Sequence, residues 1–184
     1  MDNMKMMERL KKAGFSFAPG MTGQQLEQAE TVFGFRFPRE IRDFLSCGVI
    51  LGKEFFDYRD LSAENQKQFR DFQEMIGDRF RFDLERNRDC MHEIFPGLPG
   101  DGPEFAEAVM EYLHSSPRLI PFYAHRCFLD GMDDMPILSF LQATDTIIYG
   151  STFETYLETE FLEIEETIQT PIPAMGIWTD LLLW

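Results

Sequence analysis

The chain has 184 residues, of which 44% are hydrophobic and 19 are phenylalanine, so it can bury one sizeable core and is not expected to be disordered. Its 32 acidic and 17 basic side chains give a net charge of −15, which disfavours direct binding to nucleic acid or to an anionic membrane surface. No run of about 18 uncharged apolar residues occurs, and the first nine residues carry charges where a secretory signal needs an apolar run, so we expect no membrane span and a cytoplasmic location.

The negative charge is concentrated late in the chain. No Lys or Arg follows Arg126, which leaves 21 acids against 17 bases before that point, a net of −4, and −11 in the last 58 residues. Such a segment either keeps the protein soluble as a solvated face or binds a basic partner. The eleven acids are Asp130, Asp133, Asp134, Asp145, Glu154, Glu158, Glu160, Glu163, Glu165, Glu166 and Asp180.

Residues 4–13 form a short amphipathic segment, and residues 14–20, with a proline and two glycines, are predicted to be a loop. A helix is predicted from Thr22, because Thr22 and Gln25 have the spacing of a capping box. Gly34 is expected to end that helix, Pro38 fits the first turn of a second helix, and Gly48 is expected to end the second. The predicted buried positions are Leu26, Ala29 and Phe33, followed by Ile41, Phe44 and Leu45.

The middle of the chain is predicted to be mostly helical. Ser62 is expected to cap a long helix that ends near Gly77, with Phe69, Phe72, Met75 and Ile76 on its apolar face. In residues 78–88, charged residues alternate with apolar ones, and this period of two favours a strand over a continued helix. Residues 95–103 are rich in Pro and Gly and predict turns, and a helix follows over 104–114.

From Arg118 the pattern changes to short apolar segments. The runs 119–129, 135–141 and 146–149, joined by polar or Gly-containing connections, predict a three-stranded antiparallel meander. Ser151 and Glu154 have capping-box spacing before a last helix, whose inward positions are Phe153, Leu157, Phe161 and Ile164. The apolar tail, residues 170–184 with Trp178 and Trp184, is expected to dock on the domain or on a partner.

This order of elements predicts one α+β domain over residues 1–184, with helices packed around a largely antiparallel sheet. No nucleophile motif and no phosphate-binding loop is present, so we expect no enzymatic activity and no cofactor. The loop 130–134 lacks calcium-loop spacing, and neither His92 nor His114 has a second ligand at i+4, so we expect no metal. Cys47, Cys90 and Cys127 are widely separated and are predicted to be free thiols. An enzyme with an unrecognised site remains an alternative.

Two stretches resemble the opening of the SUKH superfamily, the Smi/Knr-type domains. Residues 22–30 (TGQQLEQAE) and 33–45 (FGFRFPREIRDFL) have the helix with a Glu, the Gly, the hydrophobic–Pro step and the acidic–aromatic–Leu helix. Residues 119–126, 135–139, 145–150 and 153–157 are similar to the later strands and closing helix of that family. The chain has Cys47-Gly48 where the family often has Asn-Gly, and residues 53–117 match none of its motifs, so they form a possible insertion with this protein's own specificity.

The resemblance implies an α+β fold without enzymatic activity, and many bacterial members of the family are immunity proteins that neutralise toxins, often nucleases. We therefore expect a protein-binding module, an immunity protein whose partner is a basic, nuclease-type toxin. A nuclease presents basic surface to its substrate, which suits an acidic inhibitor. The alternative is a regulatory or scaffold protein that binds through its apolar tail. The expected contact residues are Asp130, Asp133, Asp134, Asp145, Glu154 and Glu158.

Overall fold

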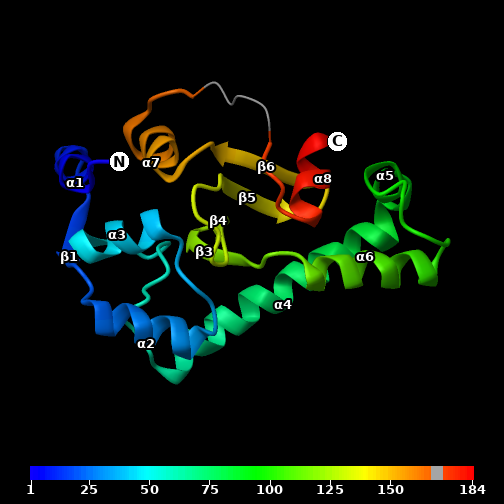
Figure 1. The fold of residues 1–184 in the computed structure, drawn as a ribbon, viewed down its shortest axis with the longest axis horizontal. Coiled ribbons are helices and arrows are strands. Elements are labelled where there is room, and N and C mark those ends of the chain that lie inside the picture. The colour runs from blue at the N-terminus through cyan, green and yellow to red at the C-terminus, as the bar shows by residue number, and fades with distance from the viewer. Residues whose placement is uncertain (167–171) are drawn as a thin grey trace.

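A computed structural model of the chain describes residues 1–166 and 172–184. In this part of the chain the fold is α+β, as predicted, with eight helices and two antiparallel sheets (Figure 1). The helices are α1 (Asn3–Lys12), α2 (Gly23–Phe33), α3 (Arg39–Cys47), α4 (Ala63–Arg86), α5 (Arg88–Ile94), α6 (Pro103–Ser115), α7 (Phe153–Leu162) and α8 (Ile177–Leu183). The strands are β1 (Ser16–Pro19), β2 (Gly48–Leu51), β3 (Leu119–Tyr123), β4 (Arg126–Leu129), β5 (Ile137–Gln142) and β6 (Asp145–Gly150).

The main sheet has four strands in the order β3-β4-β5-β6, so the prediction of three strands was wrong. The apolar run 119–129 contains a two-residue turn at Ala124 and His125, and Ala124 there adopts a positive φ of 48°. Both strands are buried on both faces, so the run is mostly apolar, and His125 and Arg126 alone do not divide it in the sequence. The predicted loop 14–20 also contains a strand, β1, which pairs with β2 more than 30 residues later.

Each face of the main sheet packs on a different set of helices. One face, with Ile120, Phe128 and Ile137, belongs to the first core, which also contains buried residues of α1, α2, α3 and α7. The other face, with Leu138 and Phe140, belongs to the second core, formed with α4, α5, α6 and α8. In Figure 1, α4 runs as a long diagonal below the sheet, and α5 and α6 extend beyond it at the end away from α1. The sheet is therefore the middle layer of three.

The predicted helix ends in the first fifty residues are confirmed. Thr22 and Gln25 make both hydrogen bonds of the capping box, and Gly34 ends α2 with a φ of 70°, which a side chain would resist. Pro38 is the N-cap of α3, and Gly48 follows its last turn. All six predicted apolar positions of α2 and α3 are buried in the first core.

Helix α4 is longer than predicted. Ser62 caps it as expected, but the helix passes Gly77 and ends at Arg86, so the predicted strand over 78–88 is wrong. Ile76, Phe80 and Leu84 recur every four residues and are buried, whereas Phe82 is exposed. The apparent period of two in residues 78–88 thus arose because the exposed Phe82 falls between Phe80 and Leu84, which belong to the buried face of a helix.

The last helix begins one residue later than predicted. Thr152 caps α7 and forms a capping box with Thr155, whereas Ser151, the predicted cap, bonds to Glu166 through both its N–H and its hydroxyl. Ile164 was predicted to face inward, but it lies beyond the end of α7 and is exposed. In the tail, Trp178 is buried in the second core and its indole N–H donates to the Pro117 carbonyl at 2.6 Å, while residues 170 and 171 lie outside the described residues.

Candidate binding surfaces

Three of the six predicted contact acids hold the start of α3. Asp130 accepts hydrogen bonds from the backbone N–H of Arg36 at 2.9 Å and from the guanidinium of Arg118 at 2.6 Å. Asp133 accepts from the backbone N–H of Arg39 at 2.7 Å, at the first residue of α3. Asp134 pairs with the guanidinium of Arg39 at 3.2 Å. These bonds tie the β4–β5 connection to the loop before α3.

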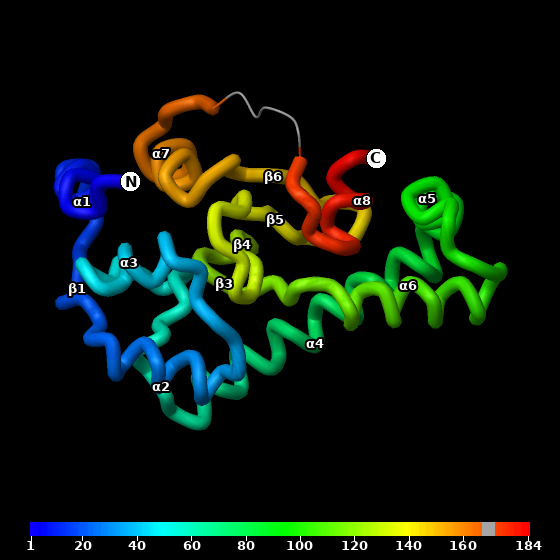
Figure 2. The backbone as a smooth tube through the Cα atoms, in the orientation of Figure 1, coloured from blue at the N-terminus to red at the C-terminus, as the bar shows by residue number. Residues whose placement is uncertain are grey.

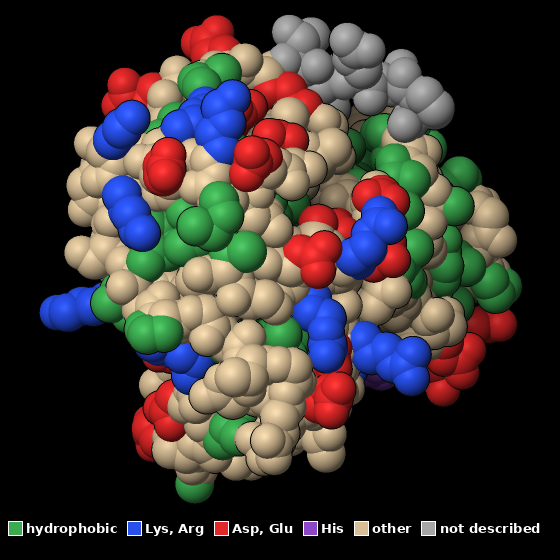
Figure 3. Space-filling model, turned by 60° about the vertical axis from the view of Figure 1, so that its left-hand side comes forward, with side chains coloured by type: hydrophobic (Ala, Val, Ile, Leu, Met, Phe, Trp, Pro, Cys, Tyr) green, Lys and Arg blue, Asp and Glu red, His purple; other side chains and the backbone are tan. Residues whose placement is uncertain are grey.

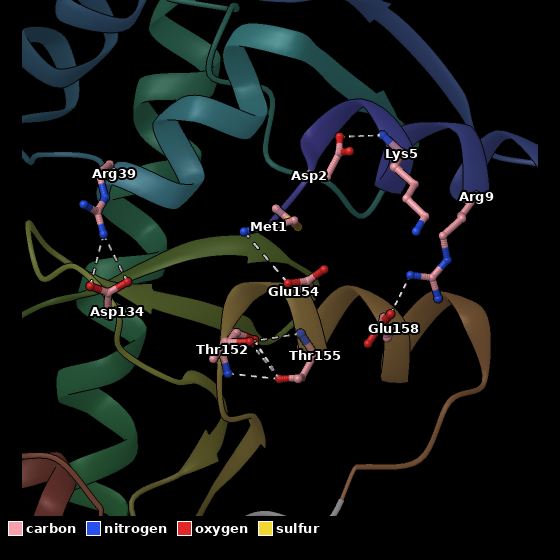
Figure 4. A network of polar contacts seen from close by, with 10 residues as sticks. All are labelled: Met1, Asp2, Lys5, Arg9, Arg39, Asp134, Thr152, Glu154, Thr155 and Glu158. Atoms are coloured by element: carbon pink, nitrogen blue, oxygen red, sulfur yellow. Dashed lines mark hydrogen bonds and ion pairs between the residues drawn. The ribbon is translucent and has the colours of Figure 1, made fainter.

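Two further acids hold α1 against α7. Figure 4 shows the N-terminal amine of Met1 beside Glu154, at 3.9 Å, and the guanidinium of Arg9 beside Glu158, at 2.5 Å. In the tube view of Figure 2, α1, from the start of the chain, lies next to α7, which comes from the last third of the chain. These five acids therefore stabilise the fold, because each bonds to a cationic or N–H group from the first forty residues.

Asp145 is the sixth predicted residue, and it is placed differently. It is exposed at the start of β6, and no basic group contacts its carboxylate within the described residues. The six acids thus do not make one surface. On the face shown in Figure 3, acidic and basic side chains are interspersed and no uniform acidic field appears.

Part of the main sheet is uncovered around Asp145. Residues on alternate positions of a strand share a face, so Leu141 of β5 and Ile147 and Tyr149 of β6 lie with Asp145 on the side that elsewhere meets the first core. The exposed fractions of Leu141 and Ile147 are 48% and 50%. We call Leu141, Asp145, Ile147 and Tyr149 the open sheet face.

Arg126 opposes Ser139 and Ser139 opposes Ile147, so Arg126 lies in the same row of side chains.

Arg126 is held in place at the inner end of this face. Its guanidinium pairs with Glu160 of α7 at 2.9 Å, donates to the Ser139 hydroxyl at 2.9 Å, and lies 3.5 Å from the centre of the Tyr149 ring. The side chains of Arg126 and Glu160 are only 10% and 15% exposed. The Arg126 guanidinium lies on the face of the Tyr149 ring and is itself held by the Glu160 carboxylate, so the position of the ring is fixed.

Acidic groups surround the nearby β3–β4 turn. Burial, and then the charge of Arg126, lower the pKa of His125, while the carboxylates of Glu160, Asp145 and Glu54 act in the opposite direction. All three carboxylates are therefore near the imidazole. Because Glu160 is paired with Arg126, the net negative charge beside the open sheet face comes from Asp145 and Glu54. The open sheet face thus combines two apolar side chains and an aromatic ring with two neighbouring carboxylates.

The described residues contain no group of three His, Cys, Asp or Glu side chains that could hold a metal ion. Burial raises the pKa of the Cys127 thiol, so this sulfur is a poor nucleophile next to His125. None of the helices within residues 1–166 and 172–184 is long and apolar enough to cross a membrane.

Of the residues predicted from charge, Asp145 alone joins the open sheet face. Sequence reasoning missed its other members, Leu141, Ile147 and Tyr149, and the neighbouring Arg126. The alternation of Asp145, Ile147 and Tyr149 in the sequence is typical of a strand with one accessible face, and it was the available indication.

Comparison of the chain with protein-family models, with curated proteins and with solved structures gave no match. The similarity to the SUKH superfamily therefore rests on the sequence motifs alone.

Proposed function

We propose that this protein is a non-enzymatic binding module that takes a basic protein partner on the open sheet face. The observation that carries the proposal is the pair Leu141 and Ile147, two large aliphatic side chains about half exposed on a rigid sheet beside Asp145, whose carboxylate pairs with no basic group among the described residues. Apolar anchors at the centre of a polar border are the usual composition of protein interfaces. The sheet supplies them without an ordering cost, because strands are already fixed.

The charge of the protein favours a basic partner. A net charge of −15 speeds encounter with a cationic protein, and Glu54 and Asp145 place negative charge beside the anchors. Together with the resemblance to the SUKH superfamily, this supports an immunity protein whose partner is a nuclease-type toxin. In that role the protein neutralises the toxin by covering basic surface that the toxin needs for its phosphate substrate.

The test is co-expression with the toxin-like product of a neighbouring reading frame, scored as growth and as affinity at 50 and 500 mM salt. I147K is expected to abolish protection and to weaken binding at least about tenfold, since one buried aliphatic side chain contributes about 1.5–3 kcal/mol. D145K is expected to have the same effect, because it places a cation opposite the basic surface of the partner. L51K changes a comparably exposed aliphatic residue on β2, and E93K changes an exposed acid on α5, so both serve as controls and are expected to protect fully. Protection by I147K and D145K at the level of the controls would contradict the proposal.

One observation favours a second candidate, a scaffold protein that binds through its tail. Leu183 and Trp184 at the end of the described chain are both exposed, although Trp178, the second residue of α8, is buried. L183S/W184S leaves the second core intact and removes this apolar end. Loss of partner binding in L183S/W184S with unchanged binding by I147K would support the scaffold over the immunity protein.

A further inference from the structure

A groove runs along α4, and its larger part is lined by residues of the second core, its smaller part by Phe33 and Phe69 of the first core. It consists of a cavity of about 560 Å³ and a neighbouring one of about 370 Å³. Both are lined by Gln73, Glu74 and Arg118, so they adjoin each other. The larger cavity has the volume of ordinary small-molecule sites, and Ile76, Leu119 and Trp178 supply its apolar lining.

The walls of the larger cavity are held by hydrogen bonds. The indole N–H of Trp178 donates to the carbonyl of Pro117, which fixes the ring. The side-chain amide of Gln73 donates to the carbonyl of Leu119 at 2.8 Å, which fixes α4 against the start of β3. The cavity is therefore formed before any ligand arrives, which lowers the entropic cost of binding.

Gly77 lines the larger cavity from the middle of α4. A glycine within a helix is less stable than an alanine there, so its presence calls for a reason. The helix does not require it for close packing against backbone, because the three nearest atoms to a Cβ at this position belong to the side chains of Arg81, at 3.3 and 3.8 Å, and Met110, at 3.8 Å. The effect of the missing side chain is to leave room in the cavity.

The groove is more basic than the rest of this acidic protein. Its lining includes three basic residues, Arg70, Arg81 and Arg118, and two acidic ones, Glu74 and Asp78. The lining thus has a net charge of +1, whereas the whole chain has a net charge of −15. Arg81 uses one terminal nitrogen to bond Asp78 at 2.9 Å. Its other terminal nitrogen and Nε have no partner among the described residues, and together they form the fork that suits a carboxylate.

We propose that this groove binds a small carboxylate with an apolar body, the body resting on Ile76, Leu119 and Trp178 and the carboxylate bonded to Arg81. The site is on the opposite side of the sheet from the open sheet face, so this inference stands apart from the proposed protein partner. The protein then carries a small-molecule site as well as a protein-binding surface.

The chain has two tryptophans, so W184F leaves Trp178 as the sole tryptophan and its fluorescence reports on the cavity. The probes are octanoate, 1-octanol and octylamine, which share one aliphatic body and differ in charge, each titrated below its micelle concentration. Octanoate is expected to change the Trp178 emission saturably and to bind about tenfold tighter than 1-octanol, with octylamine weakest. In W184F/R81Q, octanoate is expected to lose about tenfold in affinity while 1-octanol is unchanged, because in the proposed complex Arg81 meets the probe at its carboxylate and not along its aliphatic body.

Two substitutions of Gly77 test the cavity itself. G77L places an aliphatic side chain in the cavity and is expected to abolish the octanoate response, whereas G77A keeps most of the space, with the Arg81 terminus displaced slightly, and is expected to retain it. Circular dichroism establishes that both variants fold, and R81Q provides the test independently of G77L. Equal responses to the three probes, a response that does not saturate, or unchanged octanoate affinity in R81Q would overturn the proposal.

Discussion

Replacing Glu160 with Gln tests whether the Arg126–Glu160 pair is buried in the way the structure shows. E160Q keeps the shape and an acceptor oxygen but leaves the Arg126 charge without its counterion in a site where both side chains are at most 15% exposed. Removing one partner of a fully buried pair costs about 3–5 kcal/mol, and the residual solvent contact here reduces this to about 3 kcal/mol. With a urea m-value of about 2 kcal/mol/M, the midpoint of urea unfolding falls by about 1.5 M.

The double variant R126M/E160L separates burial of the pair from loss of packing. Apolar side chains of similar size remove both charges together, so we expect at least about half of the lost stability to return. D71N is the exposed comparison, because it breaks the surface pair of Lys67 and Asp71 on α4, and its midpoint is expected to equal that of the unmodified protein. If E160Q unfolds at the same urea concentration as the unmodified protein, Arg126 is solvated and the reasoning fails.

Three further predictions concern single residues. T152A is expected to lose about 1 kcal/mol of stability in urea unfolding because Thr152 caps α7, and a larger loss in S151A would contradict this assignment. A thiol reagent is expected to modify the partly exposed Cys90 quickly and Cys127, which is buried and has a raised pKa, only after denaturation; labelling followed by mass spectrometry distinguishes them. Burial and Arg126 lower the pKa of His125 below its usual 6.5. On acidification the unfolded chain therefore binds a proton at His125 before the folded protein does, so stability falls as the pH drops through 6.5. H125Q is expected to lose less of its urea midpoint than the unmodified protein between pH 7.5 and 5.5.

Local rules in the sequence predicted the first helices well. The capping box at Thr22, the left-handed Gly34 and the apolar spacing of α2 and α3 each depend on residues within one or two turns of the chain, and all appear in the structure. The same locality explains the errors. The alternation after Gly77 reads as a strand until the second core is known, because only packing against Phe140 and Trp178 shows that Phe80 faces inward and Phe82 outward.

The candidate site was harder to predict for a related reason. Composition located the excess of acids in the last third, but a count of charges does not say which of them the chain neutralises itself. Asp130 and Glu158 bond to groups 94 and 149 positions away, and no local pattern reports such distances. The open sheet face likewise depends on where the helices stop covering the sheet, which is a property of the packed molecule.

The contact between α1 and α7 has a consequence for the order of folding. Arg9 and Glu158 are separated by 149 residues, so at ribosomal speeds of about 5–20 residues per second α1 is made about 7–30 s before the helix it packs on. During this interval Met6, Met7 and Leu10, which are buried in the finished protein, lack α7 as a cover. Contacts of this separation also slow folding, because a long loop must close before they contribute. The first core is thus completed only when the end of the chain has been synthesised, and the exposed apolar side of α1 is what a chaperone would meet until then.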